Sequence, residues 1–198
     1  MGAGVAITKS AVEQYAEYEQ LVGGVETLFK DSAGQVEGYA NNAYKTAGMS
    51  ANQYMNTVTG FSASLLQSLD GDTKAAAEKA DMAITDMSDN ANKMGTSIDS
   101  IQTAYQGFAK QNYTMLDNLK LGYGGTKEEM QRLLDDATKL SGVKYDISSY
   151  ADIVDAIHVV QTEMGITGTT AKEASTTIEG SINSTKAAWS NLLTGFAN

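Results

Sequence analysis

The chain has 198 residues, no cysteine, no proline and a net charge of −10. The lack of cysteine excludes disulfides and cysteine-ligated zinc, and the acidic charge disfavours specific nucleic-acid binding. Proline averages ~5% of residues in proteins, so its absence favours long helices. No stretch reaches the ~20 apolar residues that span a bilayer, and the first residues lack the pattern of a signal peptide.

The N-terminal region predicts a long amphipathic helix. After a frayed start over residues 1–9, Ser10 and Glu13 have the spacing of a capping box, and apolar residues then recur every three or four positions as far as Phe29. Gly23-Gly24 interrupts this helix. The glycine pair indicates either a close helix contact or hinge, or a local kink or C-cap with no wider role.

Two further helices follow, over residues 36–47 and from residue 51 onward. Gly48 is a plausible stop for the first, and Ser50 with Gln53 forms a capping box for the second. The apolar residues of the second recur at intervals of 4, 3, 4 and 4, which predicts a stripe facing the core: Tyr54, Val58, Phe61, Leu65 and Leu69.

Asp70-Gly71-Asp72 predicts a turn, which fails the calcium-loop pattern at Lys74 and Ala75. An alanine-rich helix is expected from Thr73 to about Met94. Its polar group carries no histidine, and we interpret it as a hydrated helix face rather than a metal site: Asp86, Asp89, Asn90 and Asn92.

The most informative run is residues 105–130, YQGFAKQNYTMLDNLKLGYGGTKEEM. We expect a helix, a tight corner at Gly124-Gly125 and a new helix opened by the capping box Thr126–Glu129. Helical spacing would place three residues of the run on one face: Leu116, Leu119 and Tyr123. The only arginine, Arg132, and the neighbouring lysines are interpreted as solvated.

The last third predicts three helices. One ends at Gly142, the next is capped by Ser149 and Asp152, and the last is capped by Thr170 and Glu173. Trp189 and Phe196 share an apolar face and are expected to anchor packing.

These elements predict an all-α fold, a multi-helix bundle of about seven or eight amphipathic helices with glycine-rich corners, possibly extended. We expect one helical domain over residues 1–198, with sub-segments 1–69, 70–125 and 126–198.

Enzyme chemistry has little support in the sequence. His158, the only histidine, is expected to be exposed on the face opposite Ile153, Ile157 and Val160. No GxSxG elbow is present, GYGGT does not match a phosphate loop, and adjacent acids such as Glu128-Glu129 diverge on a helix. We therefore predict no enzyme, with no catalytic, cofactor-binding or metal-binding residue and no cofactor.

The central run AYQGFAKQNYTMLDNLKLGYGGTKEEMQRLL resembles the tail tape measure proteins of long-tailed phages and prophages of Gram-positive bacteria. Four other stretches resemble the same family in the same order: Leu21–Ala33, Thr59–Leu69, Asp86–Gly95 and Ala156–Thr170. Family chains are usually several times longer, so the chain resembles one domain or fragment of such a protein. A family hydrolase module cannot be carried over.

The resemblance implies a structural phage tail protein that acts as a tail-length ruler and assembly scaffold inside the tail tube. The implied partners are copies of itself, the tail tube protein, tail assembly chaperones and distal tail or tip proteins, with host membrane contact at ejection. The implied location is the lumen of the virion tail, and the host cytoplasm during assembly.

Two other functions fit the residues. A helical protein-interaction module, such as a secreted effector carrier or a signalling bundle, would also use proline-free acidic helices. A hydrolase fragment is the third.

Overall fold

All elements that the structure describes are helical, which confirms the all-α prediction. The computed structural model describes residues 2–176 and 186–194, with side chains from Ser10 onward. The α-helices over residues 2–176 are α1 Gly2–Phe29, α2 Ala33–Thr46, α3 Ala51–Ser68, α4 Thr73–Met94, α5 Ile98–Ala109, α6 Lys127–Ser141, α7 Tyr150–Glu163 and α8 Thr169–Thr176. Two 3₁₀ turns, Lys30–Ser32 and Leu116–Leu119, lie between them, and residues 186–194 are also helical.

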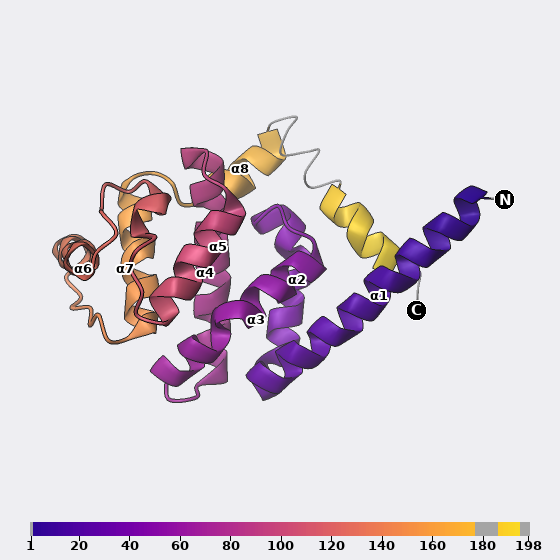
Figure 1. Ribbon diagram of the computed structural model, residues 1–198, viewed down its shortest axis with the longest axis horizontal. Helices are drawn as coiled ribbons and strands as arrows, with labels where there is room; N and C mark the ends of the chain where they lie inside the picture. Colours follow the sequence, from indigo (N-terminus) through magenta and orange to yellow (C-terminus); the bar gives the residue numbers. More distant parts are fainter. Residues whose placement is uncertain (1, 177–185, 195–198) are drawn as a thin grey trace.

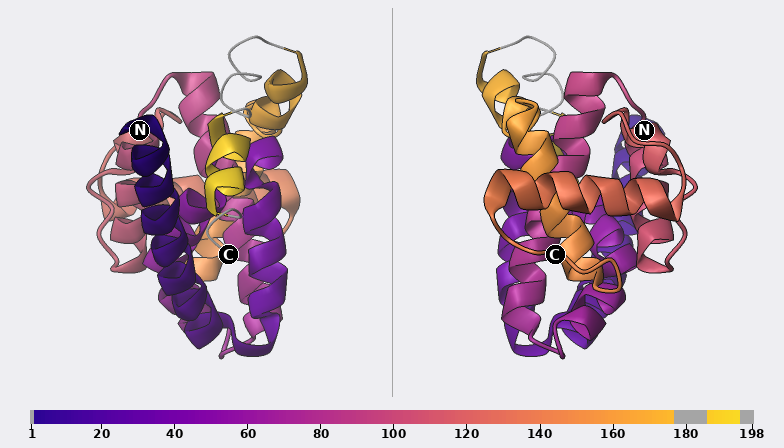
Figure 2. Two further views of the ribbon diagram at one scale, coloured as in Figure 1. Left: turned by 90° about the vertical axis from the view of Figure 1, so that its right-hand side faces the viewer. Right: turned by 90° about the vertical axis from the view of Figure 1, so that its left-hand side faces the viewer.

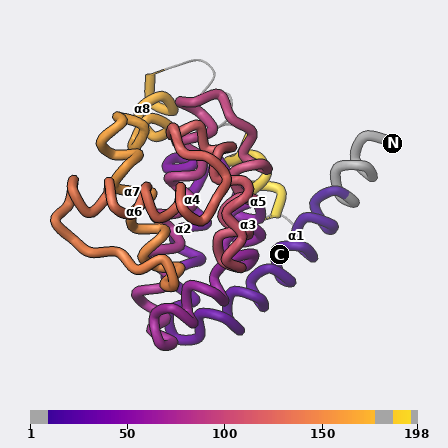
Figure 3. Tube along the Cα trace, turned by 60° about the vertical axis from the view of Figure 1, so that its left-hand side comes forward, coloured from indigo at the N-terminus to yellow at the C-terminus, as the bar shows by residue number. Residues whose placement is uncertain are grey.

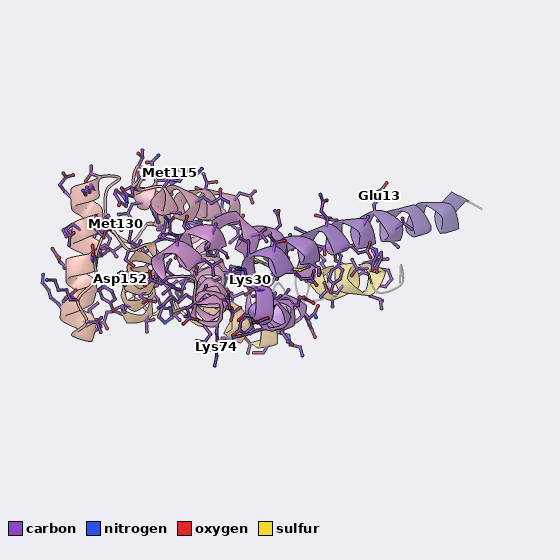
Figure 4. The ribbon with its side chains drawn as sticks, turned by 90° about the horizontal axis from the view of Figure 1, so that it is seen from below. Glu13, Lys30, Lys74, Met115, Met130 and Asp152 are labelled. Carbon is purple, nitrogen blue, oxygen red and sulfur yellow. The ribbon has the colours of Figure 1, made fainter. Side chains whose placement is uncertain are left out.

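The central element is α4, which packs against α1, α2, α3, α5, α7 and α8 (Figure 1). At one end of the molecule α6 lies across α7 (Figure 2). At the other end the first half of α1 extends past the remaining helices around Glu13, with residues 186–194 beside it (Figures 1 and 4). The Cα trace shows the chain folding back on itself repeatedly between α2 and α8 (Figure 3).

One continuous apolar core joins these helices, from Val25 to Ile166. The stripe predicted on α3 faces this core: Tyr54, Val58, Phe61 and Leu65 are buried, and Leu69 is partly buried. In a folded protein most of the stability of a helix comes from burial of such an apolar face.

Several helix ends follow the predicted capping chemistry. Ser50 and Gln53 form a complete capping box on α3, and the Thr126 and Ser149 side chains accept the expected amides of α6 and α7. Gly142 ends α6 in the left-handed conformation, with φ of 74°. Each such cap contributes about 1 kcal/mol.

The prediction of a frayed start and a break in α1 was wrong. The helix begins at Gly2, so Ser10 lies within it, and it continues through Gly23-Gly24 to Phe29. A Cβ built on Gly24 would lie 3.6 Å from the Thr59 methyl carbon of α3. Of the alternatives that the glycine pair left open, the close helix contact is the one observed, at Gly24.

The central run forms the helix predicted after the glycine corner, but not the continuous helix that its spacing predicted before the corner. After α5 ends at Ala109, Gln111 and Lys120 take left-handed backbone angles, and only a 3₁₀ turn forms between them. The buried side chains of this segment recur at intervals of three, three and two, which no α-helix can place on one face: Tyr113, Leu116, Leu119 and Leu121.

Candidate functional site

A polar cluster lies inside the molecule on α4, where a hydrated face was predicted. Asp86, Asp89 and Asn90 are 1%, 0% and 0% exposed, and only Asn92 of that predicted group is exposed. The prediction was therefore wrong for three of the four residues. Burying a carboxylate costs on the order of several kcal/mol unless it is paired, so the partners of these groups matter.

Asp86 is paired with His158 of α7. The imidazole Nδ1 lies 2.9 Å and 3.0 Å from the two carboxylate oxygens. His158 is half-buried against α4, so the prediction of an exposed histidine was also wrong. The hydrogen bond to Asp86 raises the pKa of His158, while burial of the imidazole opposes that shift. Burial raises the pKa of Asp86, and the His158 hydrogen bond opposes it.

Amide side chains extend the cluster to a third segment. Gln161 donates from Nε2 to the backbone carbonyl of Asp86, 3.1 Å away. Asn90 donates to Gln161 Oε1 at 2.8 Å and to the Leu119 carbonyl at 2.9 Å, and Thr96 donates to Asn90 Oδ1 at 2.8 Å. These bonds tie α4 to α7 and to the 3₁₀ turn of the central run.

Asp89 caps α8 from a distance in sequence. Its carboxylate accepts the backbone amides of Gly168 at 2.7 Å and Thr170 at 2.9 Å. These amides stand at the start of α8, where free N–H groups and the helix dipole favour an anion. The cap predicted here, Thr170 with Glu173, is replaced by this α4 carboxylate, since Thr170 is already inside α8.

We define the network as Asp86, Asp89, Asn90, His158 and Gln161. Its hydrogen bonds connect α4 to α7 and to the start of α8. An aspartate–histidine pair orients the base in hydrolases, but all hydrogen bonds of the His158 ring within the described residues go to Asp86. Within the same residues no group of three or more histidine, cysteine or acidic side chains could hold a metal ion. None of the helices that the structure describes is long and apolar enough to cross a membrane.

A second polar cluster holds the glycine corner to α6. Arg132 donates to both carboxylate oxygens of Glu129 and to the Gly122 carbonyl, and its guanidinium lies 4.3 Å from the centre of the Tyr123 ring. The hydrogen bond from Arg132 lowers the pKa of Glu129 to about 2. Arg132 is exposed, as predicted, and these contacts also fix its side chain. Glu129 also accepts the Gly124 amide, so it does not complete the capping box.

The C-terminal aromatic anchor is not observed. Trp189 is 58% exposed, and its expected companion Phe196 lies outside the described residues. The helical segment instead buries Ala187 and makes two polar contacts, from Ser190 to Gln14 of α1 and from the Ala51 amide to Asn191.

Comparison with known proteins found no similar one: no family model, curated protein or solved structure matches the chain.

The network could in part have been found from the sequence. Asp89 and Asn90 lie three and four positions after Asp86, and Gln161 lies three positions after His158, so each set shares a helical face. No local signal reveals that these two faces meet.

Proposed function

We propose that the chain is a folded helical domain of a phage tail tape measure protein and serves as part of the tail-length ruler and assembly scaffold inside the tail tube. The resemblance in five ordered stretches is the basis of the proposal. In the tail its partners would be copies of itself, the tube protein, tail assembly chaperones and tip proteins.

The observation that carries the proposal is where the resembling stretches lie. Asp86–Gly95 supplies the α4 part of the network, and Ala156–Thr170 supplies its partners from α7 and α8. The central run supplies the Leu119 carbonyl. The residues that carry the resemblance therefore hold helices together, and this suits a protein that acts through shape and association.

An in-frame deletion tests the role in the tail. Residues 2–198 are removed from the phage gene that encodes the chain, and tail lengths are measured by electron microscopy. We expect shorter tails or none, because the scaffold loses a packed domain. The matched control is Lys139→Ala, which changes an exposed side chain of α6 and should leave tails unchanged. Tails of parental length in the deletion strain would contradict the proposal.

A helical interaction module is the second candidate. Three large apolar side chains, Val12, Trp189 and Leu192, are 56%, 58% and 45% exposed on α1 and the segment beside it. A second protein that covers these side chains would remove their apolar surface from water. Parental tails in the deletion strain would favour this function.

A further inference from the structure

The large apolar side chains that stay exposed in the described part of the chain come from elements at opposite ends of the molecule (Figure 1). One group lies in or just after the last turns of α6 and α7: Leu140, Val143 and Met164. The other group lies on the first half of α1 and on residues 186–194: Val12, Trp189 and Leu192. Single exposed apolar side chains are common on proteins, so the shape and charge around each group decide whether it can bind a partner.

The group on α6 and α7 belongs to a groove. Leu140 and Met164 line an open hollow of about 330 Å³ between the two helices, and they are 48% and 45% exposed. Leu121 and Val160 line the same hollow and are buried. The groove therefore has a closed apolar floor and exposed apolar walls, a surface that is stabilised when an apolar side chain enters it.

One charge in the lining of this groove has no partner. Asp136 and Lys139 line it and pair with each other, at 3.3 Å. Glu163 also lines it and is exposed, and within the described residues its carboxylate has no hydrogen bond or ion pair. The groove thus combines an apolar hollow with an unpaired negative charge, which favours an apolar group that has a cation beside it.

The opposite end of the molecule presents a helix face with this chemistry. Lys186, Trp189 and Leu192 follow one another at intervals of three on the helical segment 186–194, so they lie along one side of it, and all three are exposed. Within the part of the chain that the structure describes, the Lys186 ammonium has no ion pair or hydrogen bond. The other side of the segment packs inward, since Ala187 and Thr194 are buried.

The charges of the two ends also differ. Residues 110–144, which lead into and form the groove end, carry six basic and five acidic side chains. Residues 10–29 carry four acidic side chains and no basic one, and residues 186–194 add only Lys186. Complementary potentials guide the association of two surfaces, and like charges oppose it. Contact between unlike ends of two copies is therefore favoured over contact between two acidic α1 ends.

Shape leads to the same arrangement. Two grooves facing each other would leave both hollows unfilled, whereas the segment 186–194 and the first half of α1 stand out from the body and can enter a groove (Figures 1 and 4). A contact between two different surfaces of identical chains is heterologous, and it adds copies head to tail.

We propose that the face formed by Lys186, Trp189 and Leu192 on one copy binds in the α6–α7 groove of the next copy. Trp189 would lie against the apolar walls, and Lys186 would pair with Glu163. The proposed function names copies of the chain as partners, and this inference specifies the surfaces through which they meet. It is tested on the purified chain, so its failure would not decide the role in the tail.

The test is sedimentation equilibrium of the purified full chain over a range of concentrations. We expect the average mass to rise above that of the monomer as the concentration approaches about 1 mM, where weak contacts become populated. Trp189→Ser removes the aromatic anchor, and Met164→Lys places a charge in the groove wall that repels Lys186. Each should weaken the association by at least about tenfold.

The control is Lys74→Ser, which changes an exposed side chain at the start of α4, outside both surfaces, and should associate as the parent does. Because all three changed residues are exposed, urea unfolding of each variant should have a midpoint close to that of the parent chain.

An equal mixture of Trp189→Ser and Met164→Lys separates a heterologous contact from a symmetric one. The first variant keeps an intact groove and the second an intact helix face, so together they should form a one-to-one pair and nothing larger. The proposal is overturned if the parent chain stays monomeric, which would leave the two surfaces to other partners. It is also overturned if either variant associates as the parent does, or if the mixture associates no more than the separate variants.

Discussion

At the scale of single residues, the Asp86–His158 pair makes the stability of the fold depend on pH. The native state raises the pKa of His158 above its usual value of 6.5. Because the folded protein holds this proton more tightly than the unfolded chain does, the stabilisation by His158 is complete below about pH 6.5. It is lost as the pH rises through the raised pKa.

The first prediction follows from this linkage. His158 is the only histidine, so its ring gives a single imidazole titration in the NMR spectrum. We expect a pKa above 6.5, and a free energy of unfolding, measured in urea, that falls as the pH rises above about 6.5 and through this raised pKa. His158→Ala should cost about 3 kcal/mol near pH 6, because it leaves the buried Asp86 carboxylate without its partner.

The matched control is His158→Gln, whose amide can still donate to Asp86 but does not titrate. Its stability should change less over the same pH range than that of the parent chain. Equal pH dependence in the two proteins would show that the pair does not act as described.

At the scale of elements, the glycine corner is defined by a close backbone approach. A Cβ on Gly125 would lie 2.9 Å from the carbonyl carbon of Thr114, whereas one on Gly124 would make ordinary contacts of 3.5 Å with the Glu129 side chain. The second prediction compares these neighbours by urea unfolding. Gly125→Ala should destabilise the fold by about 1–3 kcal/mol, as overpacking does, and Gly124→Ala by less than about 0.5 kcal/mol. Similar losses in both would contradict this account of the corner.

The helices with a polar N-cap residue were the ones that could be predicted from the sequence. The N-caps of α3 and α6 each bond an amide only three residues later in the chain. Such caps can therefore be recognised from the sequence alone. The segment between α5 and α6 could not be predicted, because its apolar residues meet a core built from distant helices. For the same reason the partners of Asp86 and Asp89, which lie 72 to 81 positions away, were missed.

At the scale of the whole molecule, the helices fold back on one core, although the sequence also allows an extended arrangement. A fully helical, straight chain of 198 residues would span ~300 Å at about 1.5 Å per residue. The packing of α4 against six other helices instead requires a short body, from which the first half of α1 extends (Figure 1). A ruler that contains this domain would gain less length from each residue of the domain than from a residue in a straight helix.

The most direct measurement is tail length in a phage whose gene carries residues 2–198 twice in tandem. The account predicts intact tails that are longer than those of the parent, by much less than the ~300 Å of a straight helix. Tails of parental length would contradict the proposed role as part of the ruler.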